Sequence, residues 1–93
     1  MTPELFDQSL KSVSKVLQIT EDAIFSRSRE KPIVDARHIL FYLCKKRHGM
    51  PLVYIKRYMH DHGHEVHHAT IKHGIEKVDG LIDIDHINIR IFK

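Results

Sequence analysis

Histidine is concentrated in one segment of the chain, and this segment has the side chains best suited to chemistry. Six of the nine histidines lie between residues 60 and 73. Among them, His64-Glu65-Val66-His67-His68 matches the H-E-x-x-H pattern of zinc hydrolases, in which two histidines bind the metal and the glutamate activates water. That chemistry needs the whole pattern inside one helix. Gly63 indicates a turn directly before it, which argues against one helix through all five residues, so we expect the chain not to be an enzyme.

The same segment suits two kinds of binding without catalysis. One alternative is a histidine-rich metal-binding protein, whose candidate ligands are His60, Asp61, His62 and His64. The other is an anionic partner, because the backbone N–H groups in the first turn of a helix point forward and are unpaired. We predict that a helix follows the histidines, since Ile71, Ile75 and Val78 have helical spacing. A recognition helix meets DNA in this way, and we expect no cofactor.

Positive charge is concentrated in the same part of the sequence. Residues 26–73 contain ten Lys and Arg against four Asp and Glu, whereas the rest of the chain contains five against eight. This excess is expected of a surface that approaches phosphate groups. A solvated face without a ligand is the alternative explanation.

Length and composition describe a single small domain. The chain has 93 residues, of which 42% are hydrophobic. The longest apolar run, residues 39–44, is far shorter than the roughly 20 residues needed to cross a bilayer, so we expect no membrane contact and a cytoplasmic location. Cys44 lies inside this run and is expected to be a small core residue.

The elements that position these residues are predicted to be helices, separated by proline and glycine. Helices are expected over residues 3–17 and 21–25, from Pro32 to Gly49, from Pro51 towards Gly63, and from near His67 onwards. The last two form a helix-turn-helix. Residues 26–31 are too charged to be buried and form what we call the basic loop. The fold class is therefore an all-α small helical domain.

The end of the chain has a different pattern. In residues 82–92 Ile87, Ile89 and Ile91 alternate with polar residues, a period of two rather than 3.6. We divide the single domain 1–93 into a core, residues 3–81, and a short irregular or extended tail, residues 82–93. The tail could be a packed arm, a final helix, or an edge that pairs with a partner. An alternative function is therefore a protein-interaction module that uses this tail to bind a partner protein or for self-association.

Four parts of the sequence, in order, resemble the C-terminal DNA-binding domain of the bacterial replication initiator DnaA. They are the basic loop, the helix containing ARHILFYL, the PLVYIK helix and the segment HHATIKHGIEKV. The resemblance runs from about Val13 to Leu81. It implies a helix-turn-helix whose second helix begins near His67 and which binds double-stranded DNA in a sequence-specific manner, as a replication- or transcription-associated factor. It also implies a bacterial cell or the host of a phage as the location, and replication proteins as the alternative partners of the tail.

The resemblance also implies roles for individual residues. His68 and Thr70 match positions of the family signature that read bases in the major groove, and Arg29 matches the arginine that enters the minor groove. Lys31 and Arg37 would be phosphate or neighbouring contacts. The complete predicted DNA-binding set is Arg27, Arg29, Lys31, Arg37, His67, His68, Ala69, Thr70, Lys72 and His73.

The sequence departs from the family pattern in ways that affect the expected function. The signature aspartate is His67 and the following threonine or serine is Ala69, so we expect a DNA site different from the family's standard one. The turn is longer and rich in histidine. No GxxxxGK[ST] motif occurs, and 93 residues leave no room for the family's ATPase module, so we expect no ATPase activity.

Overall fold

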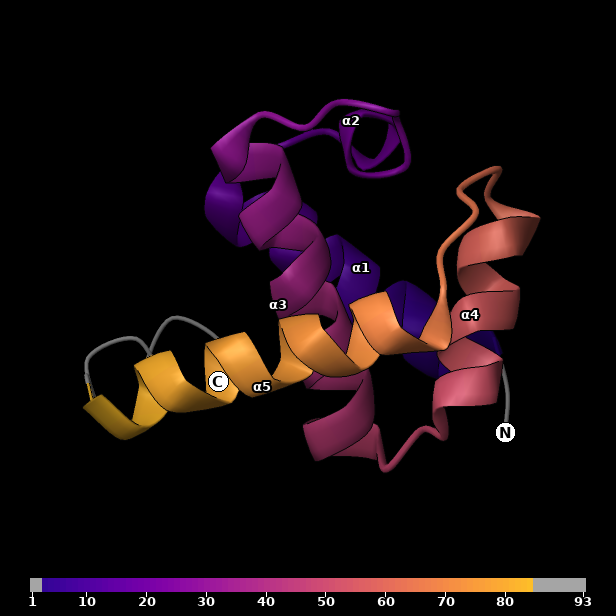
Figure 1. Cartoon of the computed structure of the whole chain (residues 1–93). Helices are drawn as coiled ribbons and strands as arrows, with labels where there is room; N and C mark the ends of the chain where they lie inside the picture. Colours follow the sequence, from indigo (N-terminus) through magenta and orange to yellow (C-terminus); the bar gives the residue numbers. More distant parts are fainter. Residues whose placement is uncertain (1–2, 85–93) are drawn as a thin grey trace.

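The computed structural model describes residues 3–84, which form five α-helices and no strand (Figure 1). The helices are α1 (Pro3–Leu17), α2 (Glu21–Ile24), α3 (Lys31–His48), α4 (Leu52–Asp61) and α5 (His68–Ile84). The predicted all-α class is confirmed, and each predicted helix is present. The first residue of each helix differs from the expected first residue by one position at most.

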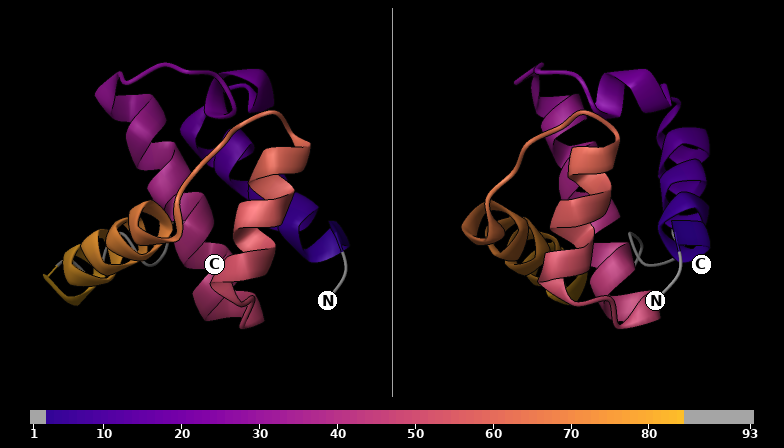
Figure 2. Two further views of the ribbon diagram at one scale, coloured as in Figure 1. Left: turned by 45° about the vertical axis from the view of Figure 1, so that its right-hand side comes forward. Right: turned by 90° about the vertical axis from the view of Figure 1, so that its right-hand side faces the viewer.

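Helix α3 lies at the centre and packs against each of the other four helices (Figures 1 and 2). Its contacts are most extensive with α5, which crosses it, and with α1. Helices α4 and α5 also pack against each other, and the turn between them, residues 62–67, is called the HTH turn below. The two helices of the predicted helix-turn-helix are thus held on a common support.

The helices begin and end at capping threonine, glycine and proline residues. The Thr20 hydroxyl accepts a hydrogen bond from the Ala23 N–H at 3.1 Å and caps α2. Gly49 ends α3 in the left-handed conformation, with φ +62°, and Gly63 at φ +86° redirects the chain after α4. Proline stands in the first turn of α3 and directly before α4, where its missing N–H costs nothing.

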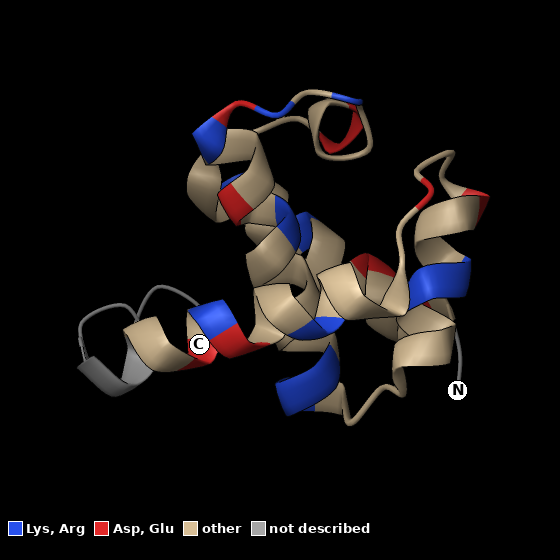
Figure 3. Ribbon diagram, in the orientation of Figure 1, with Lys and Arg blue, Asp and Glu red and all other residues tan. Residues whose placement is uncertain are grey.

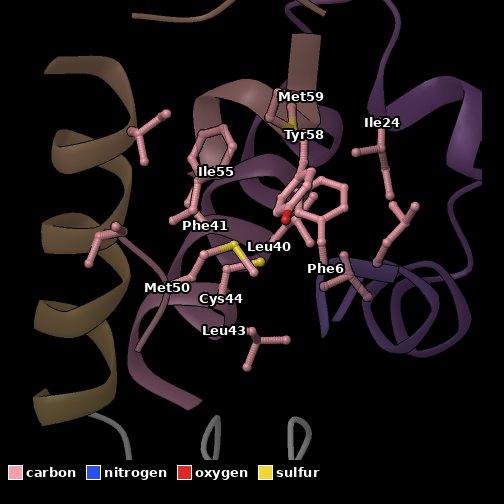
Figure 4. Packing of buried hydrophobic residues seen from close by; sticks show 14 of the residues in the cluster. Phe6, Ile24, Leu40, Phe41, Leu43, Cys44, Met50, Ile55, Tyr58 and Met59 are labelled. Carbon is pink, nitrogen blue, oxygen red and sulfur yellow. The ribbon is translucent and has the colours of Figure 1, made fainter. Parts of the chain in front are cut away.

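The core is apolar and continuous among the described helices (Figure 4). Its largest fully buried side chains include Phe6, Phe41, Leu40, Ile55 and Met59, which come from α1, α3 and α4. Cys44 is buried as predicted, and burial raises the pKa of its thiol to about 12, so that it is a neutral core residue. Val16 of α1 is 42% exposed, although it lies three residues after the buried Val13.

The last helix is longer than the sequence pattern indicated. Helix α5 continues to Ile84, three residues past the expected end of the core at Leu81, so the first residues assigned to the tail are helical. The rest of the predicted tail, residues 85–93, lies outside the described residues. Within residues 3–84, no helix is both long enough and apolar enough to span a membrane.

Candidate nucleic-acid interface

The first turn of α5 presents four consecutive exposed residues to solvent: His67, His68, Ala69 and Thr70. The carbonyl of His67 accepts hydrogen bonds from the N–H groups of Thr70 and Ile71, at 3.0 and 3.2 Å. His67 is therefore the N-cap, and the next two N–H groups point forward from the helix end. The predicted start of the helix near His67 is confirmed. This turn can offer both backbone donors and side chains to an anionic surface.

The opposite face of α5 is packed against the core. Ile71, Ile75 and Val78 are buried, as their spacing predicted, whereas Lys72 and His73 are exposed. Gly74 lies directly over α3, where a Cβ atom would stand 2.6 Å from Cδ2 of His38. Glycine at this position therefore allows α5 to approach α3 closely enough for the first turn to project outwards.

His38 is the buried histidine beneath α5. Its side chain is only 8% exposed, and its ring lies edge-on to that of His73, with 6.3 Å between centroids. Burial lowers the pKa of His38, the charge of Lys77 acts in the same direction, and Asp35 opposes both. The neutral imidazole is thus the form that fits between α3 and α5.

The basic loop connects α2 to α3, and its last residue, Lys31, is the first residue of α3. Its serines fix the backbone locally: the Ser26 hydroxyl donates to the Ala23 carbonyl at 2.6 Å and accepts from the Ser28 N–H. Arg27 and Arg29 are exposed. The loop therefore carries two exposed arginines on a defined backbone, and Figure 3 shows its Lys and Arg positions in blue along the ribbon between α2 and α3.

Arg37 differs from the other predicted contacts because it is buried. Its guanidinium donates to the carbonyls of Ile24, Ser28 and Ser26, at 2.6, 2.8 and 2.5 Å. Burial lowers the pKa of this group, but the three carbonyls satisfy its donors. Arg37 thus holds the backbone of the basic loop onto α3, a different arrangement from the phosphate contact that the sequence suggested.

Lys31 is exposed and forms an ion pair with Asp35, one turn further along α3, at 3.1 Å. An exposed pair of this kind contributes only about 0.3–0.5 kcal/mol in general. A phosphate group can therefore compete for the Lys31 ammonium at small cost.

The histidines of the HTH turn have separate partners in the fold. The His62 ring stacks on Phe25, with 4.3 Å between centroids and 5° between planes, and lies 5.6 Å from the ring of Phe6. His64 lies against the start of the basic loop, where burial lowers its pKa and hydrogen bonds from its ring to the backbone of Phe25 and Ser26 oppose this shift. His60 contacts Glu65 across the turn.

These positions contradict the zinc-hydrolase pattern. His64, Glu65, Val66 and His67 precede α5, so the two histidines of the pattern are not one helical turn apart on a helix. The other metal alternative also lacks support, because residues 3–84 contain no group of three or more histidine, cysteine, aspartate or glutamate side chains that could hold a metal ion.

The HTH turn and the basic loop meet at the same end of the molecule (Figure 2). The first turn of α5 follows directly from the HTH turn, so its exposed residues and the arginines of the basic loop are tied to one local structure. A helix-turn-helix whose turn packs against the base of an exposed cationic loop is compatible with binding DNA through a recognition helix and a minor-groove arm.

Comparison with known proteins agrees with this arrangement. The sequence model of a family described as "Bacterial dnaA protein helix-turn-helix" matches residues 6–78. The chain belongs to this family. The match extends from α1 to the middle of α5, and so includes the basic loop, the HTH turn and the first turn of α5. The resemblance inferred from the sequence is confirmed.

Relatives of the DnaA helix-turn-helix domain come from several bacteria. The chromosomal replication initiator protein DnaA of Campylobacter curvus is 35% identical over 85 residues, covering 88% of this chain and 18% of that protein. The DnaA protein of Ureaplasma parvum is 36% identical over 77 residues, covering 83% of this chain and 16% of that protein. The chain thus spans less than a fifth of the length of these curated relatives. No solved structure matches it significantly.

Three features of this DnaA-type domain were missed by reasoning from the sequence: the loop-holding role of Arg37, the stacking of His62 on Phe25, and the contact of His64 with the basic loop. Each joins residues far apart in the chain, for which spacing gives no signal. The histidine-rich turn lies directly before α5, as the sequence predicted.

Proposed function

We propose that this domain binds double-stranded DNA in a sequence-specific manner, with α5 in the major groove and the basic loop at the adjacent minor groove. The first turn of α5, whose four residues are all exposed beside the HTH turn, is the observation that carries the proposal. His68 and Thr70 would contact bases, together with their neighbours His67 and Ala69. Arg29 would enter the minor groove and Arg27 would lie beside it.

The remaining predicted residues have supporting roles in this proposal. Lys31, Lys72 and His73 are exposed and would approach phosphates, which position a protein on the duplex without reading its sequence. Arg37 would act from inside, by keeping the backbone of the basic loop in place. The domain would contribute no ATP hydrolysis, since none of the 93 residues form a GxxxxGK[ST] motif.

The biological setting follows from the family. We propose a replication- or transcription-associated factor that acts on the chromosome or on a mobile element in the bacterial cytoplasm. Because His67 and Ala69 replace the aspartate and hydroxyl residue of the family signature, the preferred site would differ from the family's standard one.

The first prediction tests DNA binding itself. The chain should bind random duplex DNA, and its affinity should fall by roughly 10²-fold or more between about 50 and 200 mM salt, because several phosphate contacts release counterions. Fluorescence anisotropy at the two salt concentrations measures this.

A matched pair of variants identifies the surface. The double variant Arg27→Ala, Arg29→Ala should bind more weakly and with a smaller salt slope. Lys11→Ala with Lys15→Ala removes the same charge from exposed positions of α1 and should have much less effect. Absence of binding by the unmodified chain at about 50 mM salt would exclude the proposed function.

A further inference from the structure

The HTH turn and the basic loop are connected by two side chains that come from the turn. His62 stacks on Phe25, the residue that ends α2, and Phe6 of α1 lies next to both rings, 5.6 Å from His62 and 6.4 Å from Phe25. The Nε2 atom of His62 also lies 3.9 Å from a carboxylate oxygen of Asp7. This arrangement places an imidazole on an aromatic platform built from two other helices.

The second connection runs through the backbone of the basic loop. His64 hydrogen-bonds with the backbone of Phe25 and Ser26, at the start of the loop. Arg37 binds carbonyls of the same stretch, those of Ile24, Ser26 and Ser28. The loop backbone is therefore held by α3 on one side and by the HTH turn on the other.

We infer that His62 and His64 are positioning residues for DNA recognition, which fix the basic loop relative to the first turn of α5. The inference rests on the proposed DNA binding and extends it. The loop would reach the minor groove and α5 the major groove, so their relative position decides whether both engage one duplex. The contacts of His62 and His64 keep the loop in this position in the free protein, so that less conformational entropy is lost when the loop binds DNA.

The decisive test is a double-mutant cycle between the turn and the loop. The probe is a duplex selected by the unmodified chain from a randomised pool. In the unmodified background, His64→Ala should weaken binding of this duplex roughly tenfold. In the Arg29→Ala background it should have almost no effect, because both changes remove the same contact of the loop with DNA. Equal losses in the two backgrounds would overturn the inference.

Conservative variants separate positioning from general damage to the fold. His64→Gln keeps a side-chain donor for the same carbonyls, and His62→Phe keeps a ring on Phe25. Both should retain most of the affinity that His64→Ala and His62→Ala lose. His48→Ala changes a histidine at the far end of α3 and should leave affinity unchanged. Thermal unfolding of every variant shows whether it is folded.

One measurement does not depend on DNA at all. Amide hydrogen exchange in the free protein should become faster across residues 26–30 in His64→Ala and His62→Ala, but remain unchanged in the middle of α3. Unchanged exchange in the loop would overturn the inference even if DNA binding were intact. Failure of the unmodified chain to bind any duplex would overturn the proposed function, while the exchange data would still decide whether the turn orders the loop.

Discussion

Exposed residues of the proposed interface differ in which part of a duplex they can reach. Thr70 stands in the first turn of α5, whereas Lys31 starts α3 and extends from an exposed ion pair with Asp35. A side chain at a base edge affects one sequence, and a side chain at a phosphate affects all sequences.

Two substitutions should therefore separate reading from anchoring. Thr70→Ala should cost roughly 1–3 kcal/mol on the preferred duplex only, and Lys31→Ala should weaken preferred and random duplexes alike and reduce the salt slope by about one. Competition binding with both duplexes measures this. If Thr70→Ala left the preference between the duplexes unchanged, the assigned role of Thr70 would be wrong.

The buried Arg37 should behave as a structural residue. Because charged hydrogen bonds contribute about 1.5–3 kcal/mol each and three carbonyls depend on it, Arg37→Ala should lower the free energy of unfolding by roughly 2–4 kcal/mol. Arg37→Lys should recover little, since an ammonium cannot span the three carbonyls. Urea denaturation measures both. A loss below about 0.5 kcal/mol for Arg37→Ala would contradict this role.

For single residues, the sequence predicted the exposure of the basic loop better than it predicted the partners of each side chain. Arg27, Arg29 and Lys31 are exposed, as expected of a loop too charged to be buried. Arg37 is one of the ten Lys and Arg of the same basic segment, yet it is buried and its guanidinium donates to backbone carbonyls of a different part of the chain. Charge content does not reveal this, because burial of a cation depends on partners that only the fold brings together.

Among the helices, the contact of α5 with α3 gives the next prediction. Gly74→Ala should lower the free energy of unfolding by roughly 1 kcal/mol, since overpacking against His38 costs about 1–3 kcal/mol and exceeds the helix propensity that alanine gains. Gly80 lies in the same helix with open space around its Cβ direction, so Gly80→Ala should stabilise the protein by about 0.5–1 kcal/mol. Chemical denaturation of both variants checks the contrast. Stabilisation by both substitutions would show that α5 is not held by this close approach.

Helix positions were predictable because their signals are local. Gly49 and the apolar spacing of Ile71, Ile75 and Val78 act within a few residues and have the expected role, and the cap that Thr20 provides for α2 is equally local. The end of α5 was not predicted, since the helix continues to Ile84, three residues into the segment assigned to the tail. The alternating isoleucines that favoured an extended segment lie outside the described residues. Periodicity over so few residues does not distinguish a strand from a helix end.

For the molecule as a whole, lowering the pH should reduce the free energy of unfolding through protonation of His38 and His64 in the unfolded chain. Burial lowers the pKa of His38 and, together with the charge of Arg37, that of His64. The unfolded chain then binds more protons than the folded one just below a pH of about 6.5. The stabilising contribution is fully present above this pH and is lost as the pH falls towards the folded-state pKa values.

The melting temperature should accordingly fall between pH 7.5 and pH 5.5. Calorimetry of the unmodified chain and of the double variant His38→Gln, His64→Gln measures the effect, since glutamine does not titrate. A decline of the same size in both proteins would assign the pH dependence to other groups.

The exposure of the first turn of α5 has a consequence for evolution. His67, His68, Ala69 and Thr70 contribute little to the core, which depends on Ile71 and the residues after it. If these residues read bases as proposed, substitutions there would change the preferred DNA sequence without being eliminated for loss of stability. Two of these four residues already depart from the family signature. Under the proposed function, a lineage would thus acquire a new DNA site one residue at a time, on a scaffold that remains folded throughout.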